Sequence, residues 1–131
     1  MLKKTIKYVD YNDVEREEDF YFNFSKAELI RMQNTTEGGL KEKLEKIIKE
    51  KNVVEIYREF EKIIFDSYGK RSEDGRRFIK SEEISNEFKQ TEAYSVLLME
   101  MIENPGYAAE FINSLLPADL RSADASKSNR S

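Results

Sequence analysis

Residues 67–81 read Ser67-Tyr68-Gly69-Lys70-Arg71-Ser72-Glu73-Asp74-Gly75-Arg76-Arg77-Phe78-Ile79-Lys80-Ser81, and they join two strongly helical halves of the chain. The segment is polar and punctuated by glycine, as a linker would be. It also carries aromatic and branched apolar residues, for which a flexible linker has no need. We therefore expect a structured elbow that sets how the two halves meet. The candidate structural or partner-binding residues, one of which lies in the following helix, are Tyr68, Arg71, Arg76, Arg77, Phe78, Ile79 and Tyr94.

The helices on either side of the elbow are predicted from apolar periodicity and from capping residues. Before the elbow, a stripe with the 3.6-residue helical period consists of Val53, Ile56, Tyr57, Phe60, Ile63 and Ile64. We expect Gly69 to end this helix in the left-handed conformation. Beyond the elbow, the residues expected to cap three further helices are Ser81, Thr91 and Asn104, the last with Pro105 in the first turn.

The first 24 residues read as two short strands, residues 4–9 and 20–24, separated by a polar loop. The second strand alternates Phe20, Phe22 and Phe24, which would line one face and pack on helices, since a lone hairpin is marginal in water. Ser25 and Glu28 are spaced as a capping box for a short helix that runs to about Gln33.

These elements predict a mainly α protein: a compact multi-helix domain over residues 1–120 with a short N-terminal β-hairpin as its minor β component. Within it we expect the hairpin at 1–24, a first helical half at 25–69, the elbow at 70–81 and a second helical half at 82–117. Residues 121–131 are Ser, Ala, Asp, Lys, Asn and Arg, and we expect a disordered tail.

Composition removes several kinds of chemistry. The 131 residues include no Cys and no His, so disulfides, thiolate metal sites and the commonest general base are absent from the chain. The net charge of −4 argues against general affinity for nucleic-acid backbones. We see no signal peptide and no apolar run of membrane-spanning length, so the default location is a cytoplasm.

Charged and glycine-rich stretches have simpler interpretations than catalysis. The acidic run at residues 15–19 lacks the ligand spacing and turn glycine of a calcium loop, and Gly38-Gly39 lacks the Lys and Ser or Thr of a phosphate loop. The lysines between Lys41 and Lys51 alternate with glutamates, as on a solvated helix face. Arg76 and Arg77 pair with carboxylates either inside the fold or on a partner, and the sequence does not separate these two alternatives. We expect no catalytic residue, no metal and no cofactor.

Several blocks in a fixed order carry a resemblance that covers residues 4–120. They are Phe22-Asn23-Phe24-Ser25-Lys26-Ala27-Glu28-Leu29, Gly38-Gly39-Leu40, the elbow itself, Phe88-x-Gln90-Thr91-Glu92-Ala93-Tyr94-Ser95-x-Leu97, Ala108-Ala109-x-Phe111-Ile112-Asn113 and Leu116-Pro117. In this order and spacing they resemble the tail assembly chaperones of long-tailed, siphovirus-type bacteriophages and prophages.

The resemblance implies a small assembly factor of the host bacterial cytoplasm that is absent from the mature virion. Its implied partner is the tape measure protein, which such chaperones bind and keep soluble during tail morphogenesis. Further implied partners are a frameshift-extended form of the chain itself and the tail tube protein, with self-association as another possibility. No membrane partner is implied, and the family pattern carries no catalytic residues.

Two other classes of function stand beside this one. A small phage- or prophage-encoded nucleic-acid-binding regulator would use the Lys41–Lys51 face together with Arg76 and Arg77, although the net charge makes nucleic acid the less favoured partner. An enzyme subunit with carboxylates unmarked by any motif is the third class, and a cleft that gathers several carboxylates would support it.

Overall fold

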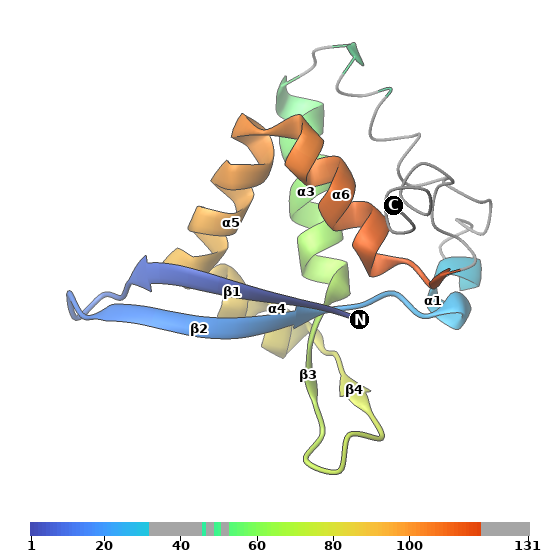
Figure 1. The fold of residues 1–131 in the computed structure, drawn as a ribbon, viewed down its shortest axis with the longest axis horizontal. Coiled ribbons are helices and arrows are strands. Elements are labelled where there is room, and N and C mark those ends of the chain that lie inside the picture. The colour runs from blue at the N-terminus through green and yellow to red at the C-terminus, as the bar shows by residue number, and fades with distance from the viewer. Residues whose placement is uncertain (32–45, 47–48, 51–52, 119–131) are drawn as a thin grey trace, which may run out of the picture.

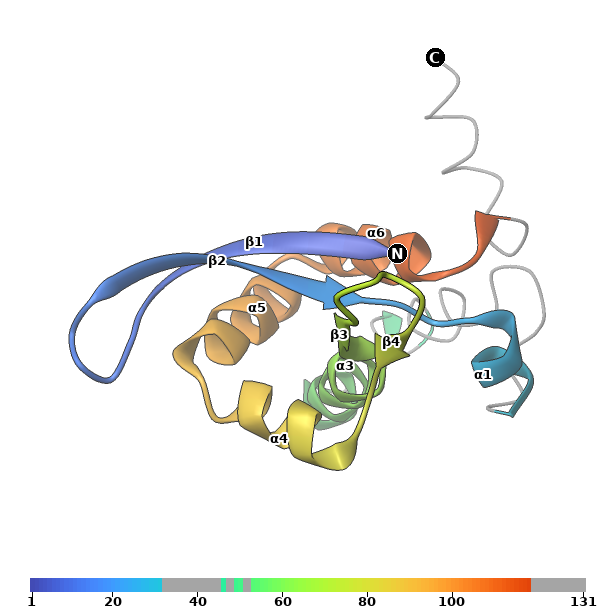
Figure 2. The same cartoon turned by 90° about the horizontal axis from the view of Figure 1, so that it is seen from below.

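The fold is a four-stranded antiparallel sheet, in the order β1-β2-β3-β4, with helices packed against it (Figure 1). The structure is a computed structural model, and it describes residues 1–31, 46, 49–50 and 53–118. Helices α3, α4, α5 and α6 lie on one side of the long hairpin of β1 and β2, and β3 and β4 project away from the helices (Figures 1 and 2). Residues 32–45, 47–48 and 51–52 of the predicted first helical half and the predicted C-terminal tail lie outside the described residues.

Strands β1 (Leu2–Val9) and β2 (Glu15–Phe22) form the predicted N-terminal hairpin, and it is longer than its sequence signals indicated. The strands pair over eight residues each, from Leu2↔Phe22 to Val9↔Glu15. Side chains alternate between the two faces of a strand. Phe22 is accordingly fully buried against the helices, whereas Tyr21 points from the opposite face.

Helix α1 (Lys26–Arg31) begins with the predicted capping box. The Glu28 backbone N–H donates to the Ser25 hydroxyl, and the Ser25 backbone N–H donates to the Glu28 carboxylate. The predicted end of this helix near Gln33 lies beyond the described residues.

Helix α3 (Val53–Ser67) runs directly into strand β3 (Tyr68–Arg71), which pairs with β4 (Phe78–Ile79). The elbow is therefore a β-hairpin that joins the sheet, since β3 also pairs with β2 at Tyr21 and Phe22. The prediction that Gly69 ends the helix in the left-handed conformation is wrong: Gly69 lies in β3, and the glycine with positive φ is Gly75, at +73°.

The second half of the chain contains helices α4 (Glu82–Lys89), α5 (Glu92–Glu103) and α6 (Pro105–Leu115). All three predicted caps are confirmed. The side chains of Ser81, Thr91 and Asn104 each accept a hydrogen bond from the backbone N–H three residues further along the chain.

The core contains a cluster of aromatic rings that connects the sheet to the helices. Phe22 contacts Phe88 and Phe111 with ring centroids 5.8 and 5.3 Å apart, and Tyr68 stacks on Phe88 at 4.4 Å. Such pairs add to the stabilisation that apolar burial gives. The predicted packing of the phenylalanine face of the second strand on helices is confirmed.

The predicted fold class is wrong in its balance: the chain is mixed α+β rather than mainly α with a minor hairpin. The difference arises in the elbow, where short strands add to the N-terminal hairpin and make a sheet of four strands. Strands of four and two residues give almost no periodic signal, so glycine and charge dominated the interpretation of this segment.

Candidate partner-binding surface

The predicted site residues separate into a buried group and an exposed group. Tyr68 and Tyr94 are only 6% and 7% exposed and belong to the aromatic core. Arg71, Arg76 and Arg77 are exposed on the β3–β4 hairpin, and Phe78 and Ile79 are half-buried at its base. The structure thus brings six of the seven candidates onto one hairpin, whereas Tyr94 lies outside it, in α5.

Tyr94 is held within the fold by a polar contact. Its hydroxyl donates to the Glu61 carboxylate of α3 at 3.1 Å, and its ring meets Phe88 edge-on at 5.8 Å. Burial and this carboxylate both raise the pKa of Tyr94 far above its usual value. Burial alone would raise the pKa of Glu61, but hydrogen bonds from Tyr57, Tyr94 and Lys89 outweigh it and lower that pKa. Tyr94 therefore links α5 to α3 within the fold.

The exposed face of the sheet carries a cluster around Gly69, on the side away from the buried phenylalanines. Tyr21 is the strand partner of Gly69, and Arg71 is the strand partner of Phe78. The Arg71 guanidinium lies over the Tyr21 ring at 4.3 Å and donates to the Tyr21 hydroxyl at 3.0 Å. The Phe78 ring lies on Gly69, where a side chain would stand 2.7 Å from ring atom Cε2. Only glycine leaves room for this ring.

The tip of the hairpin is an ordered loop. The Ser72 hydroxyl donates to the Asp74 carboxylate at 2.7 Å and accepts the Arg77 backbone N–H at 3.0 Å, and the Arg76 backbone N–H donates to the same carboxylate at 3.1 Å. The Ser72 and Arg76 bonds lower the pKa of Asp74. Gly75 supplies the positive φ that closes the turn. The backbone of Arg76 and Arg77 is thus fixed by local bonds while their side chains extend into solvent.

An open groove of about 670 Å³ lies between β2 and the hairpin, lined by residues 18–21, 68–73 and Gly75. It exists because β2 pairs with β3 at only two residues, after which the strands diverge. Its lining includes Phe20, Tyr68 and Arg71.

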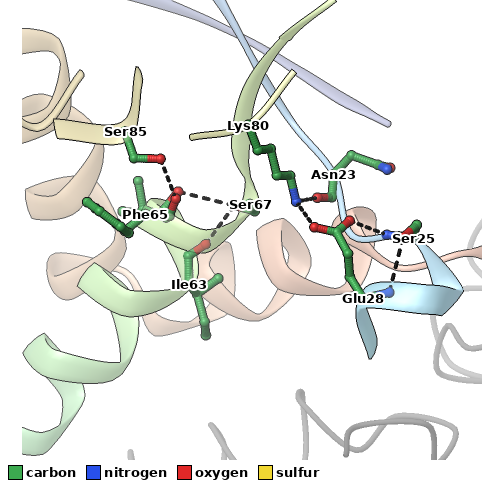
Figure 3. A network of polar contacts seen from close by, with 9 residues as sticks. Asn23, Ser25, Glu28, Ile63, Phe65, Ser67, Lys80 and Ser85 are labelled. Carbon is green, nitrogen blue, oxygen red and sulfur yellow. Dashed lines mark hydrogen bonds and ion pairs between the residues drawn. The ribbon is translucent and has the colours of Figure 1, made fainter. Parts of the chain in front are cut away.

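Lys80 anchors the base of the hairpin to the start of α1 (Figure 3). Its ammonium donates to the Asn23 carbonyl and to the Glu28 carboxylate, each at 2.6 Å. Burial acts to raise the pKa of Glu28, but the Lys80 bond and the Ser25 backbone bond outweigh it and lower that pKa. Sequence reasoning missed Lys80, because its partners lie more than 50 residues away.

Two buried serines hold the helices beside this anchor (Figure 3). The Ser67 hydroxyl, where α3 ends, donates to the Ile63 carbonyl at 2.6 Å, and the Ser85 hydroxyl of α4 donates to the Phe65 carbonyl at 2.8 Å. The Ser67 bond thus stabilises the last turn of α3, and the Ser85 bond joins α4 to α3.

A second exposed feature is the outward face of α5. Most apolar residues of this helix are buried, but Val96 and Met99 are 39% and 46% exposed. They are three residues apart and so share one face. A helix that is apolar on more than one side is usually covered by something.

The described residues contain no group of three or more His, Cys, Asp or Glu side chains that could hold a metal ion. The Lys41–Lys51 face lies largely outside the described part of the chain. Of its lysines, the structure describes only Lys46 and Lys49. No described helix is both long enough and apolar enough to cross a membrane.

The model of one protein family, described as phage tail assembly chaperone, matches residues 1–131. The chain belongs to the phage tail assembly chaperone family. This confirms the resemblance drawn from the ordered sequence blocks. Comparison with curated proteins gives no match, and comparison with solved structures gives none either. Because the family is one of chaperones, we interpret the exposed residues as a contact surface for a partner rather than as catalytic residues.

Proposed function

We propose that this tail assembly chaperone binds the tape measure protein in the host cytoplasm and keeps it soluble until the tail tube forms around it. Membership of the family supports a partner among the tail proteins. A tape measure protein presents long apolar helical stripes, and exposed apolar surface of that kind aggregates unless it is covered.

The observation that carries the proposal is the apolar outward face of α5, formed by Val96 and Met99. Their i and i+3 spacing matches the side-chain spacing by which one helix packs against another. Acidic residues flank the pair at Glu92, Glu100 and Glu103, so the bound partner would be surrounded by charge that favours solubility.

Many weak contacts of this kind would act together along one long partner. Linked sites gain affinity through effective concentration, so each chaperone need bury only a small area. We include the frameshift-extended form and the tail tube protein as further partners in the same assembly.

Co-expression with the tape measure protein of the same phage tests the proposal. We expect the tape measure protein to move from the insoluble to the soluble fraction and to co-purify with the chaperone. An unchanged insoluble fraction, with the chaperone itself soluble and folded, contradicts the proposal.

A further inference from the structure

We propose that the β3–β4 hairpin is a docking surface for an acidic segment of the protein that this chaperone binds. The inference rests on the proposed function for the class of that partner, and it adds the location and chemistry of one contact. It begins from Arg76 and Arg77, whose pairing the sequence left open between the fold and a partner.

Positive charge is concentrated on this hairpin in an otherwise acidic protein. Residues 68–79 carry four basic residues and two acidic ones, in a chain with a net charge of −4. The four basic residues are Lys70, Arg71, Arg76 and Arg77, and all four are exposed.

Among the described residues, no carboxylate forms an ion pair with any of these four cations. Elsewhere several described basic residues do pair with carboxylates: Lys4 lies 3.6 Å from Glu100, and Lys80 lies 2.6 Å from Glu28. On the hairpin, the Asp74 carboxylate accepts bonds from Ser72 and from the Arg76 backbone, so it serves the turn. The sequence left two alternatives for Arg76 and Arg77, pairing with carboxylates inside the fold or on a partner. The described structure does not contain the first.

The surface is pre-organised. Arg71 is held over the Tyr21 ring, and the turn bonds of Ser72 and Asp74 fix the backbone at Arg76 and Arg77. A site that is already ordered loses less conformational entropy when it binds. Arginine also presents a planar set of donors that fits a carboxylate through two parallel hydrogen bonds.

An acidic protein segment fits this surface better than a nucleic acid does. The neighbouring strand β2 carries Glu15, Glu17, Glu18 and Asp19, and two of these line the groove beside the hairpin. A continuous phosphate backbone crossing the hairpin would meet this acidic row, whereas a short segment with a few carboxylates would not. The β2 carboxylates also have partners of their own, since Asp19 accepts from Thr5 and Glu17 pairs with Lys7.

The test uses fluorescence anisotropy on the full chain with three labelled probes: a 16-residue peptide of Glu, Leu and Ala, the same peptide with Gln in place of Glu, and a 20-nucleotide single-stranded DNA. We expect the Glu peptide to bind, with affinity that falls as salt rises, and the Gln peptide and the DNA to bind at least about tenfold more weakly.

Two charge-reversed variants locate the contact. R76E/R77E should weaken binding of the Glu peptide about tenfold or more. R58E/K62E reverses two exposed cations of α3 instead and should change binding less than about twofold. R76K/R77K keeps the charge but loses the planar set of donors, so its affinity should lie between those of the wild type and R76E/R77E. Equal binding by R76E/R77E and R58E/K62E, equal binding of the Glu and Gln peptides, or tighter binding of the DNA overturns the inference.

Co-expression of each variant with the tape measure protein separates this inference from the proposed function. If the wild type and R76E/R77E solubilise that protein equally, the docking inference fails and the proposed function stands. If the wild type binds the Glu peptide through the hairpin but leaves the tape measure protein insoluble, the proposed function fails alone.

Discussion

The Phe78 ring lies directly on Gly69, its neighbour across the β3–β4 hairpin. A Cβ at Gly69 would stand 2.7 Å from ring atom Cε2 and 2.8 Å from the Ile79 carbonyl oxygen. An aromatic ring over a strand glycine covers backbone that would otherwise be exposed to water. The pair therefore fixes the hairpin that carries the exposed arginines.

Replacing Gly69 with Ala should destabilise the protein by about 1–3 kcal/mol, because the added methyl group cannot fit without a shift of the backbone. Chemical denaturation of the wild type and G69A measures the difference in free energy of unfolding. An unchanged denaturation midpoint would show that the hairpin moves freely and would contradict the close packing.

Phe78→Ala provides the control for this packing. Removing the ring relieves one of the two clashes, but the clash with the Ile79 carbonyl remains. The G69A substitution should therefore lower the free energy of unfolding less in F78A than in the wild type, but it should still lower it. Full additivity of the two changes would indicate that Phe78 and Gly69 do not interact.

The ion pair between Lys80 and Glu28 should make stability depend on pH. The folded-state pKa of Glu28 lies below its usual value of 4.5, so its contribution is fully present above about pH 4.5 and is lost as pH falls through the folded pKa. The difference in stability between the wild type and E28Q should therefore shrink as pH is lowered below about 4.5.

A second carboxylate near this pair behaves in the opposite way. Burial raises the pKa of Asp66, so its ionisation costs stability as pH rises through its own pKa, in both the wild type and E28Q. The Glu28 charge also contributes to this raised pKa, so comparing the two proteins across pH removes the part of the effect that burial causes. A difference in free energy of unfolding between the wild type and E28Q that stays constant from pH 7 to pH 3 would contradict the assignment to Glu28.

At neutral pH, a double-mutant cycle with K80M and E28Q should give a coupling of about 1 kcal/mol.

Tyr94→Phe should lower stability by about 1 kcal/mol and leave partner binding unchanged. The substitution removes the hydroxyl that donates to Glu61 but keeps the ring in the core. Thermal unfolding and co-purification with the tape measure protein measure the two effects separately. A loss of partner binding in a folded Y94F protein would instead favour a partner-binding role for Tyr94, which is one of the two roles that the sequence predicted for it.

Val96→Ser and Met99→Ser together should reduce co-purification of the tape measure protein while costing the chaperone only a small part of its own stability, because both side chains are partly exposed to solvent. The matched control is V53S/V54S, which removes two exposed apolar side chains from the start of α3. Equal effects of the two double variants would remove α5 as the specific contact.

Much of this fold follows from local sequence signals, and what was missed depends on long-range contacts. The caps at Ser25, Ser81, Thr91 and Asn104 were predictable because each involves residues within one helical turn. The pairing of Gly69 with Tyr21 was not, because it joins residues nearly 50 positions apart and a glycine after a helical stripe is a common helix end.

The candidate site was predicted only in part, again because its arrangement depends on long-range strand pairing. Its six elbow residues do lie on one hairpin, but their sequence could not show that Tyr68 points into the aromatic core while Arg71 points out over Tyr21. That division follows from alternation along β3, which is visible only once the segment is known to be a strand.

The most direct test of the account is size-exclusion chromatography with light scattering on a purified helical fragment of the tape measure protein, alone and mixed with the chaperone. We predict that the fragment aggregates alone and elutes with the chaperone as a soluble complex containing several chaperone copies. A fragment that aggregates to the same extent in the presence of folded chaperone, with no shared peak, would contradict the account.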